Sequence, residues 1–356
     1  MKFIHTADVH WGMNPDSDKP WSRDRAQAIR DTFAEIVRQA KLRDVDFLFI
    51  AGDLFHRQPL LRDLKEVNYL FSTIPGVRVV IIAGNHDRIR PNSALHSFTW
   101  CSNVTFIMEE NPSVYIFEKQ NVDIVSFSYH TAEITEPLLK DIHPPEAPRI
   151  HLLLAHGGDN SHLPLDKKAI ASAGFSYGAL GHIHKPEIAP DFSYAYPGSP
   201  EPLDKTETGR HGIVFGEINP ATRKVTRLEY LPLSQAQYVP LIIHVTTATT
   251  NGELCVRITD EASKRGFEHI YRFRIRGRRD PDIQFDLSSL EKRMQIIEII
   301  DESEPQYDFS RLFAQHPSDM IGFYIRTLQK EEMSTVEKKA LYYGIDALLS
   351  TTDERK

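Results

Sequence analysis

Five short polar blocks within the first 184 residues carry side chains that can bind metal ions. Each block directly follows an apolar run of the kind that forms a buried strand. Carboxylate and amide oxygens with imidazole nitrogens form a mixed donor set that suits manganese, iron or zinc, and the lack of thiolates disfavours structural zinc. The blocks are Asp8 to His10, Gly52 to His56, Gly84 to Asp87, His156 to Gly158 and Gly181 to His184.

The spacing of these residues indicates how many ions they can hold. Alternate residues of an extended segment point the same way, so we expect Asp8 and His10 to reach one ion together, and His182 and His184 to reach neighbouring positions. The seven candidate ligands exceed what one tetrahedral ion takes. We therefore predict two ions that share Asp53.

Taken singly, each block has a simpler explanation. His10 alone suits a surface or core histidine, and Gly52 with Asp53 suits a common turn. Gly84 with Asn85 suits a hairpin turn, because both residues tolerate positive φ. The joint occurrence of all five blocks, each at a predicted strand end, favours a site over five unrelated turns.

The elements that must position these blocks alternate between strands and helices. Strand-like runs near 2–7, 45–52 and 77–84 enclose helical patterns near 25–41 and 62–73, which predicts βαβ units. Hairpin-like pairs of strands up to about residue 232 make the predicted fold a mixed α/β one. The carboxyl ends of strands in open α/β sheets are where ligand sites lie, which agrees with the place of the polar blocks.

A smaller α/β pattern follows, with helices expected near 251–265 and 288–294. An acidic link at 301–308 precedes a helical tail, whose last helix is predicted to begin with a capping box of Ser334 and Glu337. The predicted domains are 1–232, 237–301 and 305–356.

Composition bounds the class of protein. The chain has 356 residues, of which 41% are hydrophobic and 26% charged, so it can bury a substantial core. Its net charge of -7 gives no overall attraction to nucleic acid, so any DNA contact must be local. Cys101 and Cys255 form no disulfide pattern, and we find no signal peptide or apolar stretch of about 18 residues. We therefore expect a cytoplasmic protein that does not enter a membrane.

The quoted blocks carry a resemblance to a known family. "GDLFH", "GNHD" and "GHIH" resemble the motifs of calcineurin-like metallophosphoesterases. With "DVHWG" and "YPGSPE" the set resembles, more narrowly, the DNA repair exonucleases of the SbcD type, which are nuclease partners of SMC-like ATPases. The resemblance covers residues 1–232. It implies a two-sheet sandwich flanked by helices, followed by a smaller α/β capping domain and a helical C-terminal tail.

The resemblance also implies roles for individual residues. His86 would be the general acid or the donor to the leaving oxygen, and Asp87 would orient its ring. His56 would help to place the DNA strand, with a stacked turn histidine as the alternative. We expect the other histidines, among them His5 and His162, to be structural. The first ion would be held by Asp8, His10, Asp53 and His184, and the second by Asp53, Asn85, His156 and His182.

Two basic clusters are candidates for DNA contacts. Arg88 and Arg90 follow the third polar block directly. Arg272, Arg274 and Arg276 alternate along a predicted strand and so line one face of it, although an exposed sheet face that discourages edge pairing explains them equally well. For the tail, the resemblance implies contact with the coiled coil of the ATPase, and core packing is the alternative.

These observations favour a two-metal phosphodiesterase. The preferred interpretation is a manganese-dependent DNA exonuclease, with endonuclease activity as a further possibility, that acts in DNA repair with an SMC-like ATPase; iron or zinc are alternative metals, and the resemblance implies a homodimer. One alternative is a metallophosphoesterase that acts on small phosphodiesters or monoesters. Another is a DNA-tethering subunit with weak catalysis, against which the presence of every expected ligand counts.

Overall fold

The computed structural model describes residues 1–351 of the chain. Its backbone contacts divide the chain into two compact units, Met1–Tyr238 and Val239–Lys356. The polar blocks all belong to the first unit, and the predicted capping domain and tail fall together in the second.

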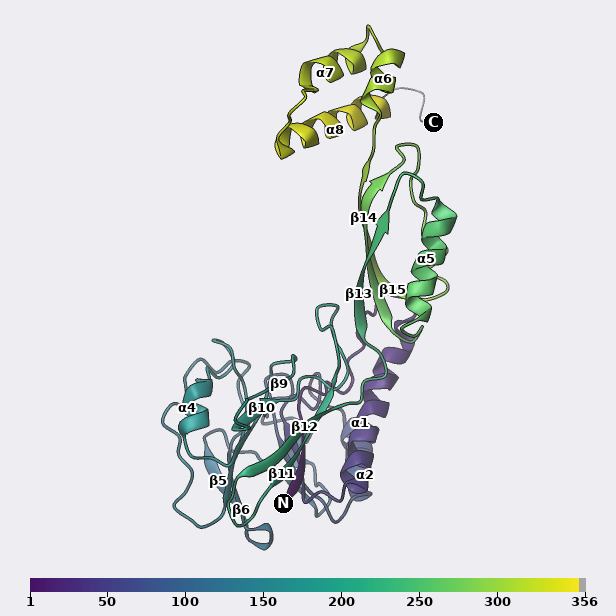
Figure 1. Ribbon diagram of the computed structural model, residues 1–356. Helices are drawn as coiled ribbons and strands as arrows, with labels where there is room; N and C mark the ends of the chain where they lie inside the picture. Colours follow the sequence, from purple (N-terminus) through teal and green to yellow (C-terminus); the bar gives the residue numbers. More distant parts are fainter. Residues whose placement is uncertain (352–356) are drawn as a thin grey trace. The chain divides into compact units, whose positions relative to one another are not determined.

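Two six-stranded mixed sheets form the centre of the first unit (Figure 1). The strand order is β12-β11-β1-β2-β3-β4 in one sheet and β5-β6-β7-β8-β10-β9 in the other. Strands β1 to β4 run parallel to one another, as do β6, β7 and β8. The bounds are β1 Lys2–Thr6, β2 Phe47–Ala51, β3 Arg78–Ile82, β4 Val104–Phe106, β5 Ser113–Phe117, β6 Val122–Ser126, β7 Ile150–His156, β8 Tyr177–Gly181, β9 Glu187–Ile188, β10 Tyr194–Tyr196, β11 Gly212–Ile218 and β12 Val225–Pro232.

Helices cover the outer faces of this sandwich. Helices α1 and α2 pack on the first sheet, and the short α4 lies on the opposite side, against the second sheet (Figure 1). The arrangement confirms the expected two-sheet α/β sandwich flanked by helices. The helical segments are η1 Ser22–Asp24, α1 Arg25–Leu42, α2 Leu61–Ser72, α3 Ala94–Ser97, η2 Glu118–Gln120 and α4 Lys167–Ser172.

Strands β2 and β3 at the centre of the first sheet are apolar almost throughout because both of their faces are buried. In β1, Phe3 contributes to the core between the sheets, whereas Ile4 contributes to the core under α1 and α2. Strand β2 repeats this with Phe47 facing inward and Leu48 facing the helices. Apolar packing on both sides fixes these strands and so gives the polar residues beyond their carboxyl ends a rigid support.

The second unit begins with a three-stranded sheet in the order β13-β14-β15, accompanied by α5. Two expectations fail here. Residues 288–294 form turns in place of a helix, and residues 301–305 of the expected link continue β15, because β15 pairs in parallel with β14 as far as Pro305. The bounds are β13 Tyr238–Val245, α5 Asn251–Ser263, β14 Ile270–Arg279 and β15 Gln295–Pro305.

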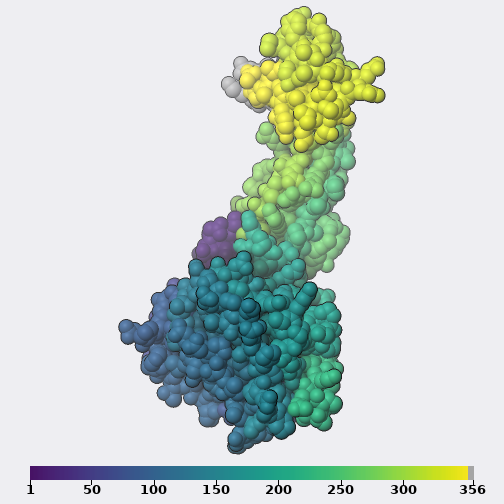
Figure 2. Space-filling view, turned by 90° about the vertical axis from the view of Figure 1, so that its left-hand side faces the viewer, coloured from purple at the N-terminus to yellow at the C-terminus, as the bar shows by residue number. Residues whose placement is uncertain are grey.

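The tail helices form an apolar cluster of their own within the second unit. Figure 2 shows the tail residues in yellow. They are α6 Phe309–Gln315, α7 Met320–Leu328 and α8 Thr335–Ser350. The predicted capping box is confirmed, since Ser334 accepts the N–H of Glu337 and the Glu337 side chain accepts the N–H of Ser334. None of the helices in residues 1–351 has both the length and the apolar character that a membrane span requires.

Candidate metal centre

The seven predicted metal ligands meet at the carboxyl ends of parallel strands from both sheets. The first sheet contributes the residues after β1, β2 and β3, and the second contributes the end of β7 and the residues after β8. Donor atoms lie within 4.8 Å of one another in two groups, Asp8 with His10 and His184, and Asp8 with Asp53 and His156. Asn85 joins them through its Oδ1, 3.1 Å from His156 Nε2, and the ring of His182 lies beside that of His156, with centroids 5.2 Å apart.

Four of these residues adopt left-handed backbone conformations, with φ of 51° at Asp8, 51° at His10, 49° at Asp53 and 92° at His182. The expectation that Asp8 and His10 alternate along an extended strand is therefore wrong, because both lie beyond the end of β1. A left-handed non-glycine residue costs about 1–3 kcal/mol and persists where surrounding contacts impose it. Here the N–H of Asp8 bonds to the carbonyl of Gly52 at 3.1 Å, and that of His10 to the carbonyl of Asp53 at 3.0 Å.

Glycines allow the backbone to pass directly against the ligands. A Cβ on Gly84 would overlap the carboxylate of Asp53, and one on Gly52, where φ is +88°, would overlap the ring of His156. The glycines of these blocks therefore serve close packing as well as turning.

The donor set fits a bound cation because acceptor atoms of His156, Asp53 and Asn85 converge on one point. The Nδ1–H of His156 is held by the carbonyl of Ala51 at 2.8 Å, so the neutral ring presents the lone pair of Nε2 to the site. That Nε2 lies 3.4 Å from a carboxylate oxygen of Asp53 and 3.1 Å from Asn85 Oδ1. Three lone pairs that face one another at this range require a cation or a proton among them.

The electrostatics of the metal-free site lead to the same conclusion. Burial raises the pKa of Asp8 to about 6, against the opposing pull of His156 and His184. Burial also disfavours the charge of Asp53, but His156 and His10 outweigh it and hold the pKa of Asp53 below its usual range. In turn, Asp53 overcomes the effect of burial on His156 and raises its pKa to about 9. Without metal, the raised pKa values of Asp8 and His156 favour bound protons at the place where divalent ions would bring positive charge.

Two carboxylates that the sequence did not single out hold the histidines of the last block. Glu207 Oε1 accepts the Nδ1–H of His184 at 2.7 Å, and Asp159 Oδ2 accepts the Nε2–H of His182 at 2.8 Å. His162, expected to be structural, also bonds to Asp159, with Nδ1 at 3.0 Å. The only signal was the position of Asp159 just after the His156 block; nothing in the sequence near Glu207 marks it.

His86 is exposed and Asp87 is buried, and they do not form the expected pair. The Nδ1–H of His86 bonds to the carbonyl of His56 at 3.0 Å. The carboxylate of Asp87 accepts the N–H of Gly84 at 2.8 Å and the N–H of Phe55 at 3.0 Å. The expectation that Asp87 orients the His86 ring is thus corrected: Asp87 ties together the two loops that carry the second and third blocks, and His56 orients His86.

His56 lies between a metal-ligand candidate and His86. Its ring stacks on that of His86, with centroids 5.2 Å apart, and its Nδ1 is 3.3 Å from Nδ1 of His10. Partial burial, and next the neighbouring His86, lower the pKa of His56. The ring contacts correspond to the stacked histidine of the alternative interpretation, but they also place His56 at the wall of a cavity.

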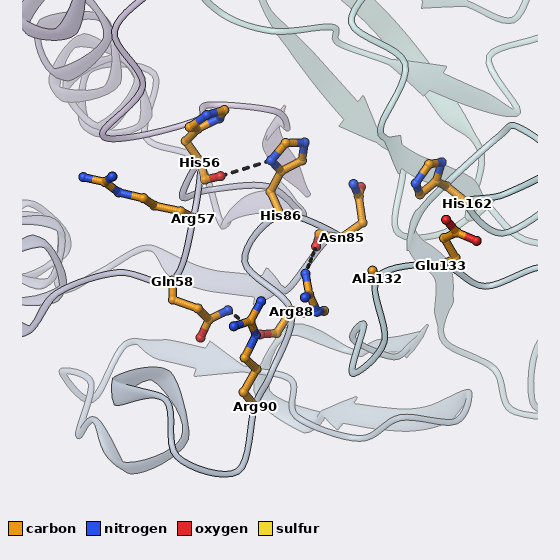
Figure 3. A pocket seen from close by; sticks show the side chains of 10 residues that line it. All are labelled: His56, Arg57, Gln58, Asn85, His86, Arg88, Arg90, Ala132, Glu133 and His162. Carbon is orange, nitrogen blue, oxygen red and sulfur yellow. Dashed lines mark hydrogen bonds between the residues drawn. The ribbon is translucent and has the colours of Figure 1, made fainter.

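That cavity, of about 520 Å³, opens beside the metal-ligand cluster (Figure 3). The side chains of Arg57, Arg88 and Arg90 line one part of it, and Glu133 and His162 lie across from them (Figure 3). Arg88 donates to the carbonyl of Asn85 at 3.1 Å, which ties it to the metal-ligand loop. Arg88 and Arg90 thus lie where the sequence predicted a basic rim, and Arg57 extends it.

The arginines of β14 are different. Arg272 pairs with Glu298 at 2.6 Å, and Arg274 and Arg276 both pair with Glu302, at 2.9 and 2.7 Å. These carboxylates stand on β15, so each guanidinium contacts a carboxylate of the neighbouring strand, and Arg274 and Arg276 share one. The salt bridges favour the exposed-sheet explanation, because two carboxylates offset most of the charge of the three arginines.

Comparison with known proteins agrees with this geometry. A model of the calcineurin-like phosphoesterase family matches residues 1–186. The chain is 28% identical over 288 residues to "Uncharacterized metallophosphoesterase YhaO" of Bacillus subtilis (strain 168), covering 74% of this chain and 68% of that protein. It is 32% identical over 242 residues to "DNA double-strand break repair protein Mre11" of Archaeoglobus fulgidus, covering 59% of this chain and 52% of the relative. The Mre11 protein of Methanopyrus kandleri is 27% identical, with the same coverage.

The chain spans about half the length of these Mre11 relatives. Among solved structures, TT1561 of Thermus thermophilus is similar over 64% of this chain and 98% of its own, at 11% identity and a TM-score of 0.36. The family match covers just over half of the chain, and all the metal-ligand candidates from Asp8 to His184 lie within it. The chain therefore belongs to the calcineurin-like phosphoesterase family and is a metal-dependent phosphoesterase.

Proposed function

We propose that the protein is a manganese-dependent DNA exonuclease that acts in repair together with an SMC-like ATPase. The observation that supports it most is the joining of the metal-ligand cluster to a cavity with a rim of three arginines, Arg57, Arg88 and Arg90. Relatives named as Mre11 repair proteins support the choice of DNA over a small phosphoester. The donor set of oxygens and imidazole nitrogens, without thiolates, suits manganese.

Two divalent ions, when bound, supply Lewis acidity that activates water and neutralises the phosphate oxygens. Residues of the chain would donate the proton to the leaving oxygen and position the proton donor. His86 keeps its Nδ1–H on the carbonyl of His56, so the imidazolium form donates its Nε2–H to the leaving oxygen. The stacked ring of His56 limits the orientations that His86 can adopt.

The arginine rim is proposed to hold the backbone of the DNA. Guanidinium groups bind phosphates in planar, bidentate geometry, and a chain with a net charge of -7 needs such local positive charge to attract DNA. Gln58 donates to the carbonyl of Arg88 at 2.8 Å and so fixes the backbone at the rim. The arginines of β14, which are held in salt bridges to β15, are not part of this contact.

The tail is proposed to contact the ATPase. Its helices α7 and α8 expose large apolar side chains, with Met320 69%, Phe323 52%, Val336 76% and Tyr343 70% exposed. Such a surface suits an apolar stripe on a partner helix. A homodimer, implied by the same resemblance, is also part of this proposal.

The test measures nuclease and phosphodiesterase activity with the same preparations. Linear duplex DNA, single-stranded DNA and bis-p-nitrophenyl phosphate are incubated with the full chain in Mn²⁺ or Mg²⁺, alongside His86→Ala and Asp53→Ala. His96→Ala, which removes an exposed histidine elsewhere in the first unit, is the matched control. We expect His86→Ala to lose DNA cleavage by about 10²-fold or more, as removal of a proton-transfer group does, and the control to retain activity. We expect Asp53→Ala to lose cleavage because it removes the carboxylate that both ions share.

Other outcomes would replace the proposal. Release of nitrophenol with no cleavage of either DNA, in the presence of a co-expressed ATPase partner, would indicate a small-molecule phosphoesterase. DNA binding with no turnover of any substrate would indicate a tethering subunit.

A further inference from the structure

We propose that Glu207 and Asp159 are positioning residues, each orienting the histidine of a different metal ion, and that the ion on the Asp159 side is the more weakly held. This inference rests on the proposed two-metal site. It concerns residues that lie outside the family motifs quoted from the sequence.

Glu207 is a fully anchored partner of His184. One oxygen accepts the Nδ1–H of His184, and the other accepts the hydroxyl of Ser199 at 3.0 Å and the N–H of Leu203 at 2.8 Å. The side chain is only 13% exposed. The tautomer of His184 is thereby fixed, and its Nε2 is directed to Nε2 of His10, 3.3 Å away.

Asp159 plays the same part for His182 but is more exposed to solvent. It accepts the Nε2–H of His182, so Nδ1 is the nitrogen left for a metal. Its oxygens are shared with Nδ1 of His162 at 3.0 Å and with the backbone N–H groups of Ser161 and His162 at 2.7 and 2.8 Å. The side chain is 47% exposed, so water competes for the same oxygens.

The two sides differ in how exposed the carboxylate is and in how many histidine rings it serves. A carboxylate that orients a metal-binding histidine typically raises metal affinity by about 10- to 100-fold. A carboxylate that is 13% exposed and serves one histidine holds that ring in one orientation, whereas one that is 47% exposed and shared between two rings does so less firmly. The ion that contacts His184 is therefore the tighter one, and the ion that contacts His182 exchanges more readily.

The test is calorimetric titration of the metal-free full chain with MnCl₂, which reads binding without turnover. Two unequal binding events are expected for the unchanged chain. Asp159→Ala is expected to weaken the weaker event by about 10- to 100-fold and leave the tighter one within about threefold, and Glu207→Ala to do the reverse. Asp159→Asn and Glu207→Gln, which keep one acceptor oxygen, should restore part of each loss.

Asp191→Asn is the matched control, because Asp191 also accepts from its own loop, at Ser193, but contacts no histidine. Urea unfolding of the metal-free variants separates a metal effect from a folding defect. Unchanged affinities in Asp159→Ala, or a loss confined to the tighter event, would overturn the assignment. A wild-type chain that binds no Mn²⁺ would instead refute the proposed two-metal function itself.

Discussion

Replacement of Asp87 tests whether this buried carboxylate supports the fold or the chemistry. It is 2% exposed and accepts two N–H groups, those of Phe55 and Gly84. A buried N–H left without an acceptor costs about 1–3 kcal/mol, so Asp87→Ala is expected to lose about 2–6 kcal/mol of unfolding free energy. Asp87→Asn keeps one acceptor oxygen and is expected to lose about half as much.

The assay is urea unfolding in EDTA, followed by tryptophan fluorescence. All three tryptophans, at positions 11, 21 and 100, belong to the first unit, so the signal reports on the unit that contains Asp87. Asp141→Ala, at an exposed carboxylate, is the control and should stay within about 0.5 kcal/mol of the parent. If Asp87→Asn kept full stability while its turnover fell, Asp87 would act on His86 after all and the reasoning would be refuted.

Four further outcomes are expected. Burial lowers the pKa of His5 to about 3, so His5 stays neutral in the folded state while the unfolded state takes up a proton as the pH falls. The free energy of unfolding should therefore fall by about 2 kcal/mol between pH 8 and pH 5, and His5→Phe should remove this loss. An unchanged pH profile of stability in that variant would contradict the reasoning. Gly84→Ala should weaken Mn²⁺ binding by about tenfold or more because its Cβ would displace Asp53, and calorimetry showing normal affinity would count against the close packing. Arg88→Ala and Arg90→Ala should each lower the slope of log binding constant against log salt concentration by about one phosphate contact. Filter binding at several salt concentrations measures this slope, and an unaltered slope would show that the replaced arginine does not contact DNA. Chelation should lower the melting temperature, and Mn²⁺ at about 100 times its dissociation constant should return about 2.7 kcal/mol; a melting curve indifferent to metal would speak against the centre.

The sequence was sufficient to place the metal-ligand candidates at strand ends, because apolar runs followed by polar blocks are local patterns. It did not predict how their backbones run. The left-handed conformations of Asp8 and His10 depend on hydrogen bonds to the loop after β2, which is distant in sequence. The alternation of side chains along a strand therefore pointed to Asp8 and His10, although the structure brings them together through left-handed turns.

Partners set by tertiary structure were also beyond the sequence. Glu207 reaches His184 across 23 residues, and Asp159 reaches His182 across the same separation, through loops whose paths no periodicity encodes. From the sequence, the arginines of β14 suited a DNA contact and an exposed sheet face equally well, since the parallel register that sets them beside Glu298 and Glu302 is a property of the sheet.

The seven donors are divided between the two sheets, four after strands β1, β2 and β3 and three at β7 and β8. Bound ions would therefore link the two sheets, which otherwise meet mainly through apolar side chains, by contacts that are lost when the metal is removed. The metal-free protein should then loosen as a pair of separating layers, with faster hydrogen exchange at the carboxyl ends of β2 and β7 together. Metal supply would in this way govern the lifetime of the folded sandwich as well as its chemistry.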